Sequence, residues 1–162
     1  MTPPSTARDV LSDAGPTDRV PPFRFSARFR VDLADTDLGA VVYWGRYPQF
    51  LDRAAIAYRR HIGVEPLGPP GHLFVMRAIT LEYSSSARFD DELEVFVRTA
   101  RLGATSHTID VRIERLGDDG GLVAGGRFTV VGLESYGGRP SPMPAGMRDA
   151  IIRFEGGAIE TA

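Results

Sequence analysis

The chain has 162 residues, a length that one domain with a single core accounts for. Its net charge of −2 excludes the strongly basic surface of a nucleic-acid-binding protein. Because the chain contains no Cys and all 19 of its basic residues are Arg, thiolate nucleophiles, Cys-ligated metals and Schiff-base lysines are excluded. It also contains no Asn that could serve as an oxyanion donor.

Residues 1–22 are rich in Pro, Ser, Thr and Asp and contain few aliphatic side chains. This composition predicts a disordered or loosely attached tail, although such tails can also become ordered against a partner subunit. A secretory signal would need a basic start and a continuous apolar stretch, and a membrane span would need about 18 apolar residues in a row. Neither pattern occurs, so we expect a cytoplasmic protein that does not bind membranes.

The first regular elements are a strand and a long helix. Apolar and polar residues alternate over 23–33, which predicts a strand with one buried face. After an acidic loop at 34–40, Pro48 suits a first helical turn, and apolar residues then recur at helical spacing until Gly63. The sequence therefore predicts one amphipathic helix over about 47–62.

The second half of the chain has β patterning. Strands are predicted at 72–83, 92–101, 104–116 and 121–134, and the Gly-Asp-Asp-Gly-Gly sequence at 117–121 predicts a hairpin turn. Strand 72–83 is apolar on both faces, so we expect the helix to cover one face and a second subunit the other. Gly125 and Gly126 indicate a bulge or a close approach of two backbones.

The order of these elements predicts an α+β domain at 23–135, with one long helix on an antiparallel sheet. Residues 1–22 precede it as the tail, and 136–162 follow it as a Pro/Gly-rich extension with a short helix. His107 lies on the apolar face of a predicted strand, where a buried structural His is the expected role.

Two acids, Asp35 and Asp37, stand immediately before the predicted helix start. Unpaired N–H groups at a helix start can polarise a carbonyl while a neighbouring carboxylate activates water or attacks directly. Asp is also a residue that caps turns, which is the structural alternative for either position. A divalent metal at Asp-x-Asp is a third interpretation, but it would need more oxygen ligands than this loop supplies.

The stretch Phe29–Gly63 resembles the hot-dog-fold thioesterases of the 4-hydroxybenzoyl-CoA thioesterase type. The resemblance rests on Asp-x-Asp, the Val-Val-Tyr that follows, and a helix with an acid and small residues near its middle. Residues 84–95 and 100–113 resemble two later segments of the same family in the right order. The resemblance covers roughly residues 24–133.

This resemblance implies a hot-dog fold with a five- or six-stranded antiparallel sheet, and hydrolysis of an acyl-CoA or aryl-CoA thioester. In the family the second Asp of the pair is catalytic, which corresponds to Asp37 as nucleophile or general base. The backbone amide of Trp44, after Tyr43, would polarise the thioester carbonyl. Coenzyme A enters only as part of the substrate, with no other cofactor and no metal, and the site lies between subunits of a homodimer or homotetramer.

The resemblance also implies which residues bind the substrate. Tyr47 corresponds to a Tyr of the family motif, and Arg88 and Arg101 to basic residues that hold the phosphates of coenzyme A. An Arg suits phosphate because its planar fork donates two hydrogen bonds at once, although each could equally be a solvated surface charge. Ser106 is a candidate polar contact.

Two residues depart from the family pattern. Ala40 stands where the family usually has Gly, so a left-handed backbone there would cost roughly 1 kcal/mol or the turn would be rearranged. Trp44 stands where many short-chain members have His, and an indole cannot act as acid or base. Trp44 could instead line an aryl or medium-chain acyl pocket, or it could pack in a core or interface.

These departures leave two alternatives open. One is a protein that binds acyl-CoA or an acyl-carrier protein without hydrolysing it. The other is a hot-dog hydratase or dehydratase, which would need a His in the site that this loop does not supply.

Overall fold

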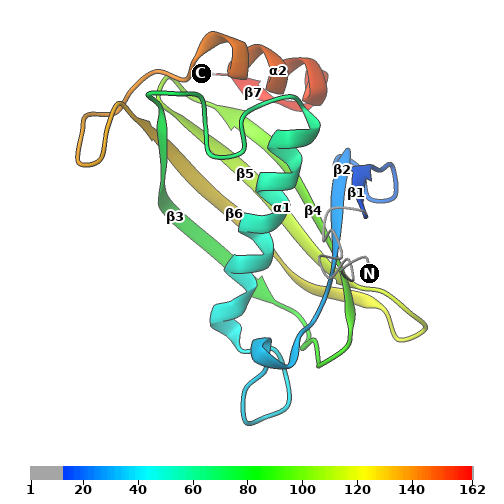
Figure 1. The fold of residues 1–162 in the computed structure, drawn as a ribbon. Helices are drawn as coiled ribbons and strands as arrows, with labels where there is room; N and C mark the ends of the chain where they lie inside the picture. The colour runs from blue at the N-terminus through cyan, green and yellow to red at the C-terminus, as the bar shows by residue number, and fades with distance from the viewer. Residues whose placement is uncertain (1–12, 162) are drawn as a thin grey trace, which may run out of the picture.

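The computed structural model describes residues 13–161, which form a curved sheet wrapped around one long helix (Figure 1). No helix in that range is long and apolar enough to cross a membrane. Three short 3₁₀ helices are η1 (Leu33–Asp35), η2 (Trp44–Arg46) and η3 (Gly156–Ala158). The longer elements are β1 (Ala14–Pro16), β2 (Phe25–Arg30), α1 (Tyr47–His61), β3 (Leu73–Tyr83), β4 (Glu92–Leu102), β5 (Ser106–Arg115), β6 (Gly121–Leu133), α2 (Ala145–Glu155) and β7 (Glu160–Thr161).

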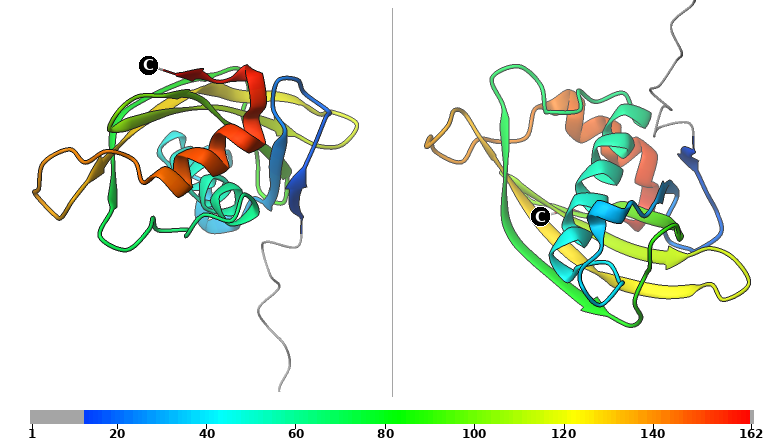
Figure 2. Two further views of the ribbon diagram at one scale, coloured as in Figure 1. Left: turned by 90° about the horizontal axis from the view of Figure 1, so that it is seen from above. Right: turned by 60° about the horizontal axis from the view of Figure 1, so that its bottom comes forward.

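The sheet has the strand order β1-β2-β4-β5-β6-β3, and β7 pairs with β4 off this path. All neighbours are antiparallel except β7, which runs parallel to β4. Figure 2 shows the strands arching over α1, so that the helix fills the concave side of the sheet. The predicted α+β arrangement is confirmed, with the short strands β1 and β7 in addition to the five long ones.

Helix α1 forms where the apolar spacing predicts it. Pro48 stands in its first turn, where a missing N–H leaves no bond unmade, and Gly63 follows its end with a φ of +77°. The apolar stripe faces the sheet and is almost fully buried. Its buried members are Tyr47, Phe50, Leu51, Ala54, Ala55, Ala57 and Tyr58.

The strand predicted at 23–33 is longer than the observed strand. Strand β2 ends at Arg30, and Leu33, expected on the buried face, is 67% exposed at the start of η1. The reason is a capping box in which Asp32 accepts a hydrogen bond from the amide of Ala34 while Asp35 accepts one from the amide of Asp32. These side chain–backbone hydrogen bonds turn the chain after Arg30, although the alternating pattern of the sequence continues to residue 33.

The prediction of a loosely attached tail over 1–22 is wrong for residues 13–22; residues 1–12 lie outside the described residues. Strand β1 pairs with β2, and Arg19 bonds the carboxylates of Glu94 and Glu114 on β4 and β5. The guanidinium of Arg19 also lies 5.0 Å from the ring centre of Phe96. The segment therefore covers the outer face of the sheet, which its polar composition does not indicate.

The extension at 136–162 contains α2, in the stretch where the sequence predicts a short helix, and β7. Glu155 at the end of α2 is 1% exposed and accepts hydrogen bonds from Tyr58 Oη at 2.7 Å and from the amide of Thr99 at 2.8 Å. Burial raises the pKa of the Glu155 carboxyl. This carboxyl joins α2, α1 and β4, so the extension is packed against the domain rather than lying apart from it.

Strand β3 forms an edge of the sheet and is largely exposed in this single chain. Met76 is 51% exposed and Tyr83 47%. The apolar pattern of 72–83 is therefore only partly accounted for by α1, and coverage of the other face by a second subunit stays a prediction.

The glycines of β6 differ in what surrounds them. A Cβ at Gly126 would lie 2.0 Å from the carbonyl oxygen of Thr80 on β3, whereas one at Gly125 would lie 3.7 Å from the nearest atom. The close backbone approach indicated by the sequence is thus confirmed at Gly126, where β3 and β6 pair.

We expect Gly126→Ala to lower the free energy of unfolding by about 1–3 kcal/mol, because the new methyl meets backbone that cannot move without shifting β3. Gly125→Ala is the matched control and should change it by less than about 0.5 kcal/mol. Urea denaturation of the three proteins measures both effects. Equal destabilisation by the two substitutions would contradict this account of Gly126.

Candidate active site

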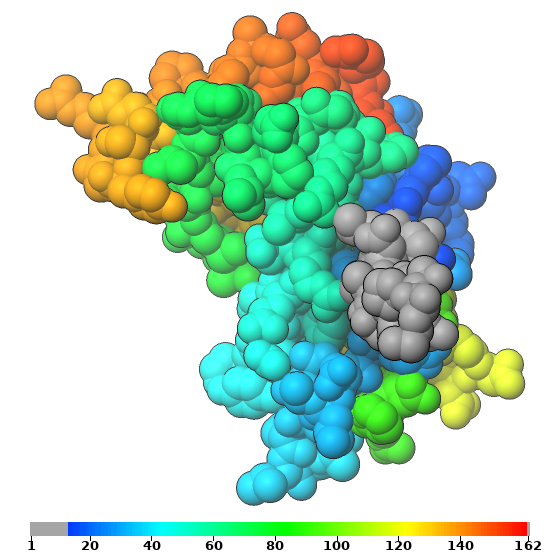
Figure 3. Space-filling model, viewed as in Figure 1, coloured from blue at the N-terminus to red at the C-terminus, as the bar shows by residue number. Residues whose placement is uncertain are grey.

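The acidic loop before α1 is a tight hairpin. Asp37 donates its amide hydrogen to Val41 O at 2.9 Å, and its own carbonyl accepts from the amide of Ala40 at 3.0 Å. A bridge between Thr36 and Val42 continues the pairing. The segment from 36 to 42 projects from the end of the molecule at which α1 begins (Figure 3).

The two acids of this loop have different surroundings. The Asp35 carboxylate accepts from the amide of Asp32 and lies 3.4 Å from Arg46, so it holds the loop together. The Asp37 side chain is exposed, and its Oδ1 accepts only from the amide of Gly39, at 2.7 Å. Both acids therefore cap turns, as the structural alternative predicted, but only Asp37 remains available to a reactant.

Two backbone amides just before α1 are left without a hydrogen-bond partner within residues 13–161. The amides of Trp44 and Gly45, in η2, make no hydrogen bond to any described residue. The carbonyl of Trp44 accepts a hydrogen bond from Tyr83 Oη at 3.1 Å, which ties η2 to the end of β3. The amide of Tyr43 donates to Asp35 O at 2.9 Å, so η2 and the hairpin of Asp37 form one unit.

The aromatic residues predicted here differ in exposure. Tyr43 and Trp44 are exposed, with ring centres 5.0 Å apart, and Gly45 leaves room for the Tyr43 ring. Tyr47 is 3% exposed, and its hydroxyl accepts a hydrogen bond from the amide of Ala87 at 3.3 Å. Its position therefore does not support the predicted role in binding substrate; it joins α1 to the loop at 84–91.

That loop also places one of the two predicted phosphate-binding residues near Asp37. Arg88 forms a β-bridge with Val41, and its exposed side chain lies beside the hairpin. Its backbone is fixed by Asp91, whose carboxylate accepts from the amide of Arg88 at 2.7 Å. Arg88 and Asp37 thus share one end of the molecule.

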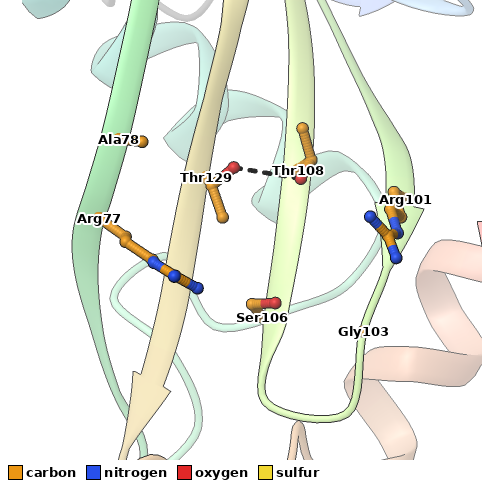
Figure 4. A pocket seen from close by; sticks show the side chains of 7 residues that line it. All are labelled: Arg77, Ala78, Arg101, Gly103, Ser106, Thr108 and Thr129. Carbon is orange, nitrogen blue, oxygen red and sulfur yellow. Dashed lines mark hydrogen bonds between the residues drawn. The ribbon is translucent and has the colours of Figure 1, made fainter. Parts of the chain in front are cut away.

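Arg101 and Ser106 lie elsewhere, in a cavity of about 490 Å³ that we call the outer pocket. It is hollowed in the face of the sheet that points away from α1, across β4, β5, β6 and β3. Figure 4 shows Arg77 and Arg101 on opposite sides of it, with Ser106 between them. The lining residues are Arg77, Ala78, Arg101, Gly103, Ser106, Thr108 and Thr129.

Both arginines of the outer pocket stand at irregularities in the sheet. The β3–β6 register shifts at Arg77, between Met76 and Ala78, and the β4–β5 register shifts between Thr99 and Arg101. A bulge re-aims the side chain beside it, which accounts for two Arg side chains converging from non-adjacent strands. Neither Arg forms an ion pair with any residue in the range 13–161.

Sequence reasoning missed Arg77, together with Thr108 and Thr129, whose hydroxyls lie 3.2 Å apart in the outer pocket. The alternation of polar and apolar residues indicates that both threonines face outward from their strands. It does not indicate that they lie side by side, because that depends on the order of the strands in the sheet. Among residues 13–161, no group of three or more His, Asp or Glu side chains is arranged to hold a metal ion.

Comparison with known proteins identifies relatives of the chain. A family model described as the thioesterase superfamily matches residues 39–122. The chain is 37% identical over 86 residues to the acyl-CoA thioester hydrolase YbgC of Escherichia coli, covering 52% of this chain and 64% of that protein. It is 31% identical over 94 residues to the acyl-CoA thioesterase YbgC of Haemophilus influenzae, covering 56% and 69%. The chain therefore spans slightly less than two thirds of the Escherichia coli relative.

Solved structures show the same fold. A thioesterase superfamily protein from Jannaschia sp. has a TM-score of 0.78 at 21% identity, covering 88% of this chain and 89% of its own. A thioesterase from Thermus thermophilus, solved with coenzyme A and Zn, has a TM-score of 0.70 at 29% identity, covering 81% and 93%. The hot-dog fold predicted from the sequence is confirmed by these likenesses.

The hairpin of Asp37 contains a strained residue. Ala40 adopts a φ of +58°, so the turn keeps the left-handed conformation there although Ala stands where the family usually has Gly. We expect Ala40→Gly to raise the free energy of unfolding by about 0.5–1 kcal/mol, because Gly removes the strain of the Cβ there. Ala34→Gly, outside the left-handed region in η1, should lower it by a similar amount. Thermal unfolding compares the two; a stability loss in both variants would contradict the strain at Ala40.

Proposed function

The chain belongs to the thioesterase superfamily, and we propose that it hydrolyses the thioester bond of an acyl-CoA or aryl-CoA, giving the free acid and coenzyme A. The observation that carries the proposal is the arrangement before α1. An exposed carboxylate, Asp37, and two unengaged backbone amides, at Trp44 and Gly45, belong to one hydrogen-bonded unit. A carboxylate beside amide donors is what addition to a thioester carbonyl requires.

The amides at Trp44 and Gly45 donate hydrogen bonds to the thioester oxygen and stabilise the negative charge that develops on it. As a general base, Asp37 takes a proton from water while the water oxygen bonds the carbonyl carbon; the C–S bond then breaks, and the thiolate takes the proton. As a nucleophile, Asp37 bonds the carbonyl carbon itself, the thiolate leaves, and water hydrolyses the resulting anhydride. Both routes give the same products.

The outer pocket suits the phosphates of coenzyme A. Arg77 and Arg101 bring two cations without ion-pair partners in the described range, and Ser106 adds a hydroxyl. Arg forms strong charge-assisted bonds with phosphate. The Escherichia coli relative is an acyl-CoA thioester hydrolase, and the Thermus thermophilus neighbour was solved with coenzyme A, which supports this substrate class. Arg88, beside the hairpin, adds a third cation near Asp37.

Within one chain, however, the outer pocket borders Gly103, whose carbonyl accepts a hydrogen bond from Arg148 of α2, while the hairpin of Asp37 precedes the start of α1. Figure 1 shows that α2 lies at the opposite end of α1 from this start. Helix α1 alone is about 22 Å long at 1.5 Å per residue. We therefore propose a homodimer in which β3 pairs with β3 of a second copy. Antiparallel pairing brings the α2 end of one chain beside the Asp37 end of the other.

The edge of β3 supports this dimer. It is 11 residues long, unpaired on one side within residues 13–161, and carries exposed apolar side chains such as Val75, Met76 and Ile79. Monomeric proteins rarely leave a long apolar edge strand uncovered, because it templates pairing with another chain. Each acyl-CoA would then contact Asp37 of one copy and Arg77 and Arg101 of the other. The cytoplasmic location expected from the sequence stays a prediction.

We expect Asp37→Asn to lower kcat for acyl-CoA hydrolysis by about 10²–10⁴-fold with little change in substrate affinity, because Asn keeps the shape and removes the base. Thiol release from acetyl-, hexanoyl-, lauroyl- and benzoyl-CoA measures it. Asp118→Asn, an exposed acid in the turn between β5 and β6, is the control and should be unaffected.

The alternative of a binding protein without hydrolysis has its own signature. No turnover of any thioester, with equal acyl-CoA binding by the wild type and Asp37→Asn, would overturn the proposed function and favour that alternative.

A second prediction tests the shared site. Arg101→Gln should raise KM for acyl-CoA about tenfold through the lost phosphate contact, yet leave hydrolysis of an N-acetylcysteamine thioester, which has no phosphates, unchanged. Arg139→Gln, an exposed Arg outside both sites, is the control. In the proposed dimer, each site takes Asp37 from one copy and Arg101 from the other. A mixed dimer of Asp37→Asn and Arg101→Gln therefore contains one site in which both residues are native. Unfolding the two variants, mixing them and refolding them together should restore activity at low substrate concentration. Activity no higher than the average of the separate variants would contradict a site shared between copies.

A further inference from the structure

A second cavity lies on the other face of the sheet, between α1 and strands β3, β5 and β6. It has a volume of about 200 Å³, and we call it the helix-side pocket. A dry cavity of about 150 Å³ accommodates a benzene ring, so this one is large enough for a substituted ring or a medium acyl chain. Most of its walls are apolar, but three side chains are polar. The residues that matter here are Ile56, Phe74, Phe128, Asp52, Arg59 and His107.

Arg59 brings a partly buried cation without a counter-ion into this pocket. Its Nε donates to Ala55 O at 3.3 Å, and its guanidinium lies 5.4 Å from the ring centre of Phe74. No carboxylate in the described range lies within ion-pair distance of it; Asp52 attracts it from an exposed position at the rim. Burial lowers the pKa of Arg59. A desolvated cation of this kind is stabilised by an anion that reaches it.

His107 lies beside Arg59 and also has no partner. It is 5% exposed, and neither ring nitrogen forms a hydrogen bond with the residues that the structure describes. Burial, with the nearby charges of Arg59 and His72, lowers the pKa of His107 to about 4, so the ring is neutral at pH 7. The ring lines the helix-side pocket, so a nitrogen without a protein partner can face a ligand there. One ring N–H is available to an acceptor in the pocket.

The helix-side pocket lies within reach of a catalytic loop if β3 pairs with a second copy. Phe74 and Met76 of the pocket stand near the start of β3, and Tyr83, which bonds the carbonyl of Trp44, stands at its end. Antiparallel pairing centred on the middle of the strand places the start of β3 beside the end of its counterpart. The pocket of one copy then adjoins the Trp44 amide of the other.

We infer that the helix-side pocket receives the acyl part of the substrate and that Arg59, with His107, selects acyl groups that end in a carboxylate. This inference rests on the proposed function. The apolar walls take the methylene chain or ring, and the two donors take the terminal anion. The nucleotide phosphates of coenzyme A do not compete for this place, because the pocket is small and mostly apolar and the outer pocket supplies separate cations.

The experiment compares pairs of thioesters of equal carbon number that differ only in the terminal group: glutaryl- with pentanoyl-CoA, adipoyl- with hexanoyl-CoA, and suberoyl- with octanoyl-CoA. The measured quantity is the ratio of kcat/KM within each pair. Arg59→Met keeps the apolar stem over Phe74 and removes the charge, whereas Arg59→Lys keeps the charge. Arg60→Met, at the next position and exposed, is the matched control.

For at least one chain length we expect the wild type to prefer the carboxyl-terminated member, and Arg59→Met to lower the ratio by about tenfold or more. Arg59→Lys should retain part of the preference, and Arg60→Met all of it. A wild type that prefers the methyl-terminated member at every length overturns the inference, even if no Arg59 variant folds. So does a ratio that Arg59→Met leaves unchanged in all three pairs.

Failure of the proposed function would be separately visible. If no thioester is hydrolysed, calorimetry with non-hydrolysable thioether analogues of adipoyl- and hexanoyl-CoA still tests whether the helix-side pocket selects a terminal carboxylate. Tighter binding of the adipoyl analogue that Arg59→Met abolishes supports the inference; equal binding of the two analogues by the wild type overturns it.

Discussion

Helix α1 buries seven side chains in the concave side of the sheet, and the remaining features take their positions from this packing. Its start fixes η2 and the hairpin of Asp37, because Tyr47 anchors that end to Ala87. Its flank toward β3 forms one wall of the helix-side pocket. Its far end meets α2 through Tyr58 and Glu155. The packing of this apolar stripe thus positions both the proposed catalytic loop and the helix-side pocket.

The sequence predicted the strands and the helix whose apolar residues recur at a regular spacing. Alternation located β4, β5 and β6 to within two residues, and helical spacing located α1. It failed where side chain–backbone bonds or distant partners override the pattern. The capping box of Asp32 ends β2 early, and Arg19 orders a polar segment by reaching acids on β4 and β5. Neither the capping box nor the contacts of Arg19 depend on the local pattern of hydrophobic residues, so that pattern could not predict them.

The candidate site divides in the same way. Asp37 and Trp44 lie within eight consecutive residues, so a motif could indicate them. Arg77 and Arg59 could not be found so, because each joins its pocket through sheet order, a register shift or the packing of α1. Tyr47 shows a limit of the motif, because its place there suggested contact with substrate whereas the structure buries its side chain against the loop at 84–91.

The hydrogen bond from Arg148 of α2 to Gly103 O, 2.9 Å long, links the C-terminal helix to the turn between β4 and β5. Gly103 lies in the turn that borders the outer pocket, within the span matched by the family model, whereas α2 lies beyond that span. Helix α2 thus braces one wall of the outer pocket. A substitution at Arg148 would therefore alter the shape of the outer pocket from outside its lining, without touching the hairpin of Asp37 at the start of α1.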